Sequence, residues 1–139
     1  MTKSVLLCVD DEIIVLHALK DLLHTVYGHQ HVIEIAESAE EGLEIIDEQV
    51  QDGCELLVIV SDWLMPGMKG DEFLIESHKR LPKVVKIMLS GHADPAAVQR
   101  AREHAKLHDF VHKPWDGATL LRSIQSGLSG EVGVPATVP

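Results

Sequence analysis

The chain has few basic residues for its size. Its 139 residues include 12 lysines and arginines against 22 aspartates and glutamates, a formal net charge of −10 at pH 7. A domain that binds a nucleic-acid backbone needs clustered basic side chains, so this balance argues against DNA or RNA binding by this chain. It equally disfavours an anionic membrane surface. An acidic cluster that takes up a divalent cation is compatible with the same charge.

Cysteine is also scarce. Cys8 and Cys54 do not form a CxxC motif, and Cys8 lies inside an apolar run, which favours reduced, buried thiols and a cytosolic protein. The N-terminal residues are not typical of a signal peptide, because acids follow a very short apolar run. No apolar run approaches the roughly 20 residues that span a bilayer. We therefore expect a cytoplasmic protein without membrane association.

What the sequence does contain is a regular alternation of strand-like and helix-like segments. Continuous or alternating apolar runs predict five strands, at residues 5–9, 32–36, 56–60, 84–89 and 110–111. Apolar residues at helical spacing predict a helix after each strand, the last of them running to about residue 128. The apolar fraction of 45% is ordinary for one globular domain with a real core.

This alternation implies βαβ units and a parallel sheet. The runs at 5–9 and 56–60 are apolar throughout, so both faces of these strands should be covered. The run at 32–36 carries Glu34 and suits an edge. We predict an α/β fold, a doubly wound (flavodoxin-like) five-stranded parallel sheet of order 2-1-3-4-5 with helices on both faces. Its ligand crevice would open between the first and third strands.

Polar side chains follow four of the predicted strands. Asp10 and Asp11 follow the first, Asp62 the third, Ser90 ends the fourth, and Lys113 follows the fifth. These strand ends lie on one edge of a parallel sheet, so the side chains should converge. Carboxylates so close repel one another, and a divalent cation reverses that penalty. Mg²⁺ prefers oxygen ligands and often bridges to a phosphoryl oxygen, and a carboxylate can attack phosphorus to form an acyl phosphate.

Four motifs match a known family. In order and spacing, VLLCVDDE, VSDWLMPGMKGDEF, MLSGHAD and FVHKPWD resemble the receiver domain of two-component response regulators. The resemblance covers about residues 3–128. It implies Asp62 as the acceptor of a phosphoryl group from a phosphohistidine on a sensor histidine kinase. It also implies a Mg²⁺ ion bound directly by Asp11, through water by Asp10, by Asp62 and by the backbone carbonyl of Leu64.

The resemblance further implies a switch. Ser90 and Lys113 would bind the phosphoryl group, and Phe110 matches the aromatic switch position. Phosphorylation would draw the loop 90–95 inward and change the face formed by the fourth helix, fifth strand and fifth helix, where an output domain or a second copy would bind. The kinase, or a phosphotransfer protein, is the other implied partner. A cis peptide bond before Pro114 is also implied.

On this interpretation the chain is a signalling module and not an enzyme, because it catalyses only its own Mg²⁺-dependent phosphorylation and dephosphorylation. Residues 1–128 would form the receiver domain. Residues 129–139 would be a flexible tail, or a linker to an output domain.

Two departures from the family pattern bear on function. Phe110 stands where tyrosine is often found and lacks the hydroxyl group that could hold the inward rotamer. Leu64 and His92 occupy positions that flank the route of the hydrolytic water in receivers. Our hypothesis is that the bulky Leu64 side chain shields the acyl phosphate and slows its hydrolysis.

Two other function classes compete with this interpretation. A haloacid-dehalogenase-type phosphatase also uses an Asp nucleophile and Mg²⁺, but it needs a second acid two residues after the nucleophile, where this chain has Leu64. A binding scaffold that works without phosphorylation would not need the complete acid set. His104 and His108, four residues apart, could bind a metal on a helix, but no third ligand is evident and a solvated helix end is the favoured interpretation.

Overall fold

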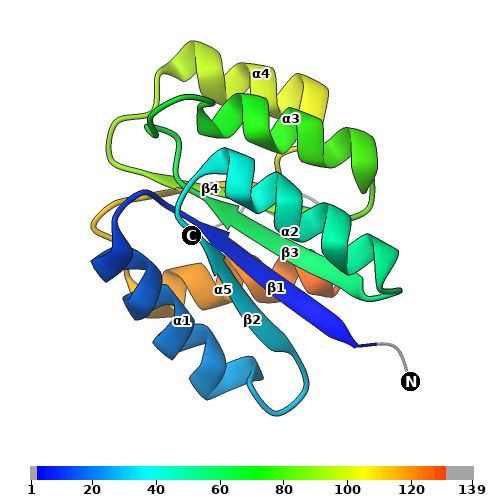
Figure 1. The fold of residues 1–139 in the computed structure, drawn as a ribbon. Helices are drawn as coiled ribbons and strands as arrows, with labels where there is room; N and C mark the ends of the chain where they lie inside the picture. The colour runs from blue at the N-terminus through cyan, green and yellow to red at the C-terminus, as the bar shows by residue number, and fades with distance from the viewer. Residues whose placement is uncertain (1–2, 131–139) are drawn as a thin grey trace.

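The computed structural model describes residues 3–130 of the chain, and Figure 1 shows the arrangement of its strands and helices. Strands and helices alternate strictly, as the sequence predicts. The elements are β1 (Ser4–Val9), α1 (Ile13–Tyr27), β2 (Val32–Ala36), α2 (Ala39–Gln51), β3 (Glu55–Ser61), α3 (Gly70–Arg80), β4 (Val85–Ser90), α4 (Pro95–Ala105), β5 (Asp109–His112) and α5 (Gly117–Leu128).

The five strands form one parallel sheet in the order β2-β1-β3-β4-β5, which confirms the predicted topology. β2, the strand with Glu34, is an edge, and β1 and β3 lie inside the sheet. Val9 at the end of β1 pairs with Ala36 of β2 on one side and with Ser61 of β3 on the other. The carboxyl ends of β1 and β3 are therefore level, which places the residues that follow them side by side.

Helices cover both faces of the sheet. α2, α3 and α4 lie on one face, and α1 and α5 lie on the other (Figure 1). The apolar residues of β1 alternate between two cores: Val5, Leu7 and Val9 pack on the α2–α4 side, while Leu6 and Cys8 pack on the α1–α5 side. The central strands are therefore packed on both faces, and this packing holds the ends of β1 and β3 in place.

α3 begins against the backbone that follows β3. It starts at Gly70, whose N–H donates to the Trp63 carbonyl at 2.8 Å. A Cβ atom at this position would overlap the carbonyl oxygen of Asp62 and the Cα of Trp63. Glycine therefore allows the helix to start against the backbone that follows β3, and this contact fixes the path of the chain next to Asp62.

The interpretation of His108 as part of a solvated helix end is wrong. α4 ends at Ala105 because Lys106 takes a left-handed conformation, with φ of 52°. His108 lies beyond it, half-buried, and its Nε2 forms a 2.7 Å hydrogen bond with the Ser126 hydroxyl of α5.

The predicted tail is described only at Ser129 and Gly130, since residues 131–139 lie outside the described part of the chain. Within residues 3–130, no helix is long and apolar enough to cross a membrane.

Candidate functional site

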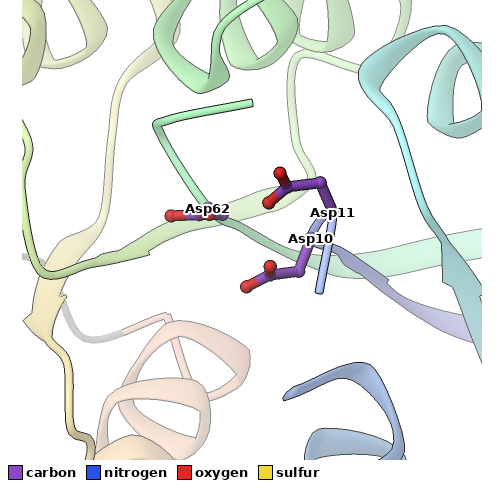
Figure 2. A group of neighbouring side chains, drawn as sticks. All are labelled: Asp10, Asp11 and Asp62. Atoms are coloured by element: carbon purple, nitrogen blue, oxygen red, sulfur yellow. The ribbon is translucent and has the colours of Figure 1, made fainter. Parts of the chain in front are cut away.

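Three aspartates meet at the carboxyl edge of the sheet. Asp10 and Asp11 follow β1, Asp62 follows β3, and Figure 2 shows the three side chains together. Each offers a carboxylate oxygen within 4.8 Å of the others, close enough to share one metal ion. Asp10 and Asp62 are buried, with 1% and 6% of their surface exposed, whereas Asp11 is exposed. The group therefore combines two desolvated acids with one that faces solvent.

Lys113 inserts its ammonium group among these acids. Its Nζ lies 2.8 Å from Asp10 Oδ2, 3.5 Å from Asp62 Oδ2 and 3.7 Å from Glu12 Oε1. The residue sits just beyond β5, and the Lys113–Pro114 peptide bond is cis, as the resemblance implies. One cation thus bridges acids that come from the ends of two different strands.

The electrostatics of the site follow from burial and crowding. Burial raises the pKa of the Asp10 carboxyl above its ordinary value, against the lowering effect of its hydrogen bond from Lys113. Burial, followed by the Asp10 charge, raises the pKa of Asp62. Burial by itself lowers the pKa of Lys113, but its hydrogen bond to Asp10 and the surrounding negative charges more than reverse this, so its pKa is raised. A divalent cation at the carboxylates would stabilise their ionised forms.

Backbone contacts fix the orientation of Asp62. Its N–H donates to Val9 O at 2.9 Å, which ties it to the end of β1. Its Oδ1 accepts a 2.8 Å hydrogen bond from the N–H of Trp63, so Oδ2 is the oxygen that faces Lys113. Of the two carboxylate oxygens of Asp62, Oδ1 is therefore held by a backbone hydrogen bond, while Oδ2 lies next to the Lys113 ammonium.

An open cavity of about 710 Å³ lies over this arrangement. Its walls come from the loops after β1, β3, β4 and β5, and they are formed by Asp11, Glu12, Asp62, Leu64, Met65, Pro66, Ser90, Gly91, His92, Lys113 and Pro114. Ser90 is buried, and its hydroxyl accepts a 3.2 Å hydrogen bond from the N–H of His92. Leu64 reaches outward with 48% of its surface exposed. Acids, a hydroxyl and an ammonium therefore line one hollow large enough for a phosphoryl group.

The structure brings most of the predicted site residues together. Asp10 does not line the cavity, but its carboxylate contacts the cavity residue Lys113. Phe110 does not reach the cavity wall: it is half-buried, stacks edge-on against the His112 ring with centroids 4.7 Å apart, and packs on the core of the α2–α4 face. Phe110 lies on β5 outside the cavity lining, and its switch role remains a prediction.

One buried acid near the site is missing from the sequence prediction. Asp71, in the first turn of α3, is only 2% exposed and is bound by Trp63 and Arg100. An acid at the start of a helix is ordinarily explained by the helix dipole, so the sequence alone carries no signal for its burial.

Comparison with known proteins defines the family. The response regulator receiver domain profile matches residues 6–125, so the chain belongs to the response regulator receiver domain family. It is 26% identical over 129 residues to the Hydrogenase transcriptional regulatory protein HoxA of Cupriavidus necator, covering 93% of this chain and 25% of HoxA. It is 37% identical over 77 residues to the Transcriptional regulatory protein FixJ of Azorhizobium caulinodans, covering 55% of this chain and 34% of FixJ.

A solved structure supports the same family assignment. A CheY-like response regulator receiver domain protein from Methanospirillum hungatei JF-1 superimposes with a TM-score of 0.79 at 27% identity, covering 94% of this chain and 97% of that one. The chain is thus a receiver domain of two-component response regulators, a signalling module. It spans about a quarter of HoxA and a third of FixJ, and those two are transcriptional regulators by name.

Proposed function

We propose that Asp62 accepts a phosphoryl group from a phosphohistidine of a sensor histidine kinase or a phosphotransfer protein. The position of Asp62 Oδ2 carries the proposal, because this oxygen lies beside the Lys113 ammonium on the wall of the cavity. Oδ2 attacks phosphorus and forms the acyl phosphate, while the bond from phosphorus to the histidine nitrogen breaks and that nitrogen keeps the electron pair. Lys113 neutralises charge on the phosphoryl oxygens in the transition state.

The acids fit a magnesium site. Asp11 and Asp62 would bind Mg²⁺ directly, Asp10 through water, and the backbone carbonyl of Leu64 would complete the protein ligands. The support is chemical, since these donors are all oxygens and three carboxylates lie within sharing distance. A bound Mg²⁺ would supply positive charge for the phosphoryl oxygens and offset the repulsion between the acids.

Ser90 and Lys113 would couple phosphorylation to the α4–β5–α5 surface. Moving an equilibrium from 1:99 to 99:1 takes about 5.5 kcal/mol of differential affinity, and one hydrogen bond to a charged group supplies about 1.5–3 kcal/mol. Ser90 alone therefore falls short, whereas Ser90 and Lys113 together with the metal reach the required range. The loop 90–95 moves toward the phosphoryl group, Phe110 follows, and the surface then binds an output domain or a second copy differently.

The first test is covalent labelling. Incubation with acetyl phosphate and Mg²⁺ is expected to add one phosphoryl group, detected by intact mass and by the lability of acyl phosphates toward hydroxylamine. Chelation of Mg²⁺ and the Asp62→Asn substitution should each abolish labelling. Asp21→Asn, which changes an exposed acid on α1, is the matched control and should label normally. Equal labelling of the Asp62→Asn variant would overturn the proposal.

Leu64 sets the lifetime of the acyl phosphate in this proposal. Its half-exposed side chain lines the same cavity as Asp62, and an asparagine there could orient an attacking water. Leu64→Asn is expected to speed the loss of phosphate from purified phosphoprotein by at least roughly tenfold. Val50→Asn is the control, because Val50 has the same exposed fraction of 48% and lies on α2 away from the cavity. An unchanged hydrolysis rate in Leu64→Asn would eliminate the shielding role.

A further inference from the structure

Trp63 is held at two points. Its backbone N–H donates to Asp62 Oδ1 at 2.8 Å, and its indole Nε1 donates to Asp71 Oδ1 at 2.9 Å. The ring is half-buried and packs against the core of the α2–α4 face. Trp63 therefore connects the carboxylates of Asp62 and Asp71 through a single residue.

Asp71 links Trp63 to a different helix. It lies in the first turn of α3, it is 2% exposed, and its Oδ2 receives Arg100 Nε at 3.1 Å and Nη2 at 3.0 Å. Both of its oxygens are thus occupied, one by the indole and one by the guanidinium. A buried carboxylate needs such partners, because removing one leaves charge without compensation.

Arg100 belongs to α4, which lies next to α3 in the fold (Figure 1). Its side chain is 53% exposed, and among residues 3–130 Asp71 is the only acid with which it forms an ion pair. The contact therefore depends on where α4 lies. Arg100, Asp71, Trp63 and Asp62 form one continuous chain of contacts from an exposed helix face to the carboxylate of the site.

We propose that Arg100, Asp71 and Trp63 form a relay by which the position of α4 sets the geometry of Asp62. Asp71 and Arg100 are positioning residues that act through Trp63, and neither touches the phosphoryl group. With the relay intact, Asp62 Oδ1 stays bound to the Trp63 N–H and Oδ2 faces the cavity. A partner that moves α4 thereby changes the phosphorylation rate of Asp62. The kinetic part rests on the proposed function of Asp62.

Asp71→Asn tests the relay with little change in shape. The indole and Arg100 donate to different oxygens of Asp71, so in an asparagine one of these two donors would face the amide NH2 group, which is itself a donor. We expect Asp71→Asn and Arg100→Gln each to slow labelling by acetyl phosphate by roughly tenfold at saturating Mg²⁺, because misplacing a reacting group by a fraction of an ångström has effects of this size. The double variant should be no slower than either single variant, as for residues that act as a unit. Arg102→Gln, an exposed arginine on the same helix, should label at the wild-type rate.

A second measurement does not require phosphorylation. In a Trp115→Phe background Trp63 is the only tryptophan, and its emission should shift in both relay variants but not in the Arg102→Gln control. Labelling rates are normalised to the folded fraction from urea unfolding, so a variant that merely loses stability would show a normal rate per folded molecule. A normal rate and unchanged emission in Arg100→Gln would overturn the relay while leaving the proposed function standing. If wild-type protein took no label but the emission shifts appeared, the proposed function would fail and the contact chain would stand.

Discussion

Replacing Lys113 by methionine is expected to slow phosphorylation of Asp62 at least about a hundredfold while raising the affinity for Mg²⁺. The rate falls because the ammonium is the protein's own cation beside Asp62 Oδ2, where charge on the phosphoryl group must be neutralised. The affinity rises because the same ammonium occupies Asp10 Oδ2 at 2.8 Å and repels an incoming cation. Labelling by acetyl phosphate gives the rate, and calorimetric titration with Mg²⁺ gives the affinity.

The opposite directions of the two effects make this test specific. A variant that was simply misfolded would lose both properties together. Lys20→Met, an exposed lysine of α1, is the control and should change neither. A Lys113→Met protein that labels at the wild-type rate would show that Lys113 serves only to balance charge in the metal-free site.

Replacing Lys86 by methionine is expected to stabilise the protein at pH 7 by about 1–3 kcal/mol. Lys86 lies on β4 with 1% of its surface exposed, and its Nζ donates to Val84 O at 2.7 Å. Among residues 3–130 no acid forms an ion pair with it. Burial, and then the charge of Lys106, lowers the pKa of the Lys86 ammonium from 10.5 to about 8. At about 1.4 kcal/mol for each pKa unit, keeping it charged opposes folding by on the order of 3 kcal/mol.

The pH dependence has a definite sign. Between pH 8 and 10.5 the folded protein has released the Lys86 proton while the unfolded chain still holds it, so stability rises with pH across this window. Below pH 8 both states are protonated and the full penalty applies. His78 shares this environment, but burial and the two lysine charges lower its pKa below 6.5, so it titrates outside the window. Losing the hydrogen bond to Val84 offsets part of the gain by about 1 kcal/mol.

Urea unfolding at pH 7 and pH 9.5 measures both predictions for Lys86. The wild-type protein should gain stability between these pH values, and Lys86→Met should lose most of that gain. Lys83→Met, an exposed lysine just before β4, should behave as the wild type does. A Lys86→Met protein that is less stable at pH 7 would mean that the ammonium is better solvated than its burial indicates.

The parallel sheet and the meeting of the acids could be predicted from local patterns. Alternating strand and helix segments imply parallel strands, and parallel strands bring their carboxyl ends to one edge. Asp10, Asp11, Asp62, Ser90 and Lys113 all follow or end such strands, so their approach needed no knowledge of packing. Helix boundaries were less certain, because the start of α3 depends on the fit of Gly70 against the Asp62 carbonyl rather than on periodicity.

The sequence by itself thus determined the fold class and the residues that gather at the site, because strand and helix periodicity are local properties. The strand order followed from which strands read as inner or edge strands and from the order common to this fold class. Only the tertiary structure decided the environments of Asp71 and Lys86. Asp71 is a helix-start acid by its position, yet one of its two partners, Arg100, is 29 residues away on α4. Lys86 stands in an ordinary strand, yet β4 lies between β3 and β5 and is covered on both faces. The burial and the ion-pair partners of these two side chains depend on which helices and strands pack against them, and the spacing of residues along the chain does not predict those contacts.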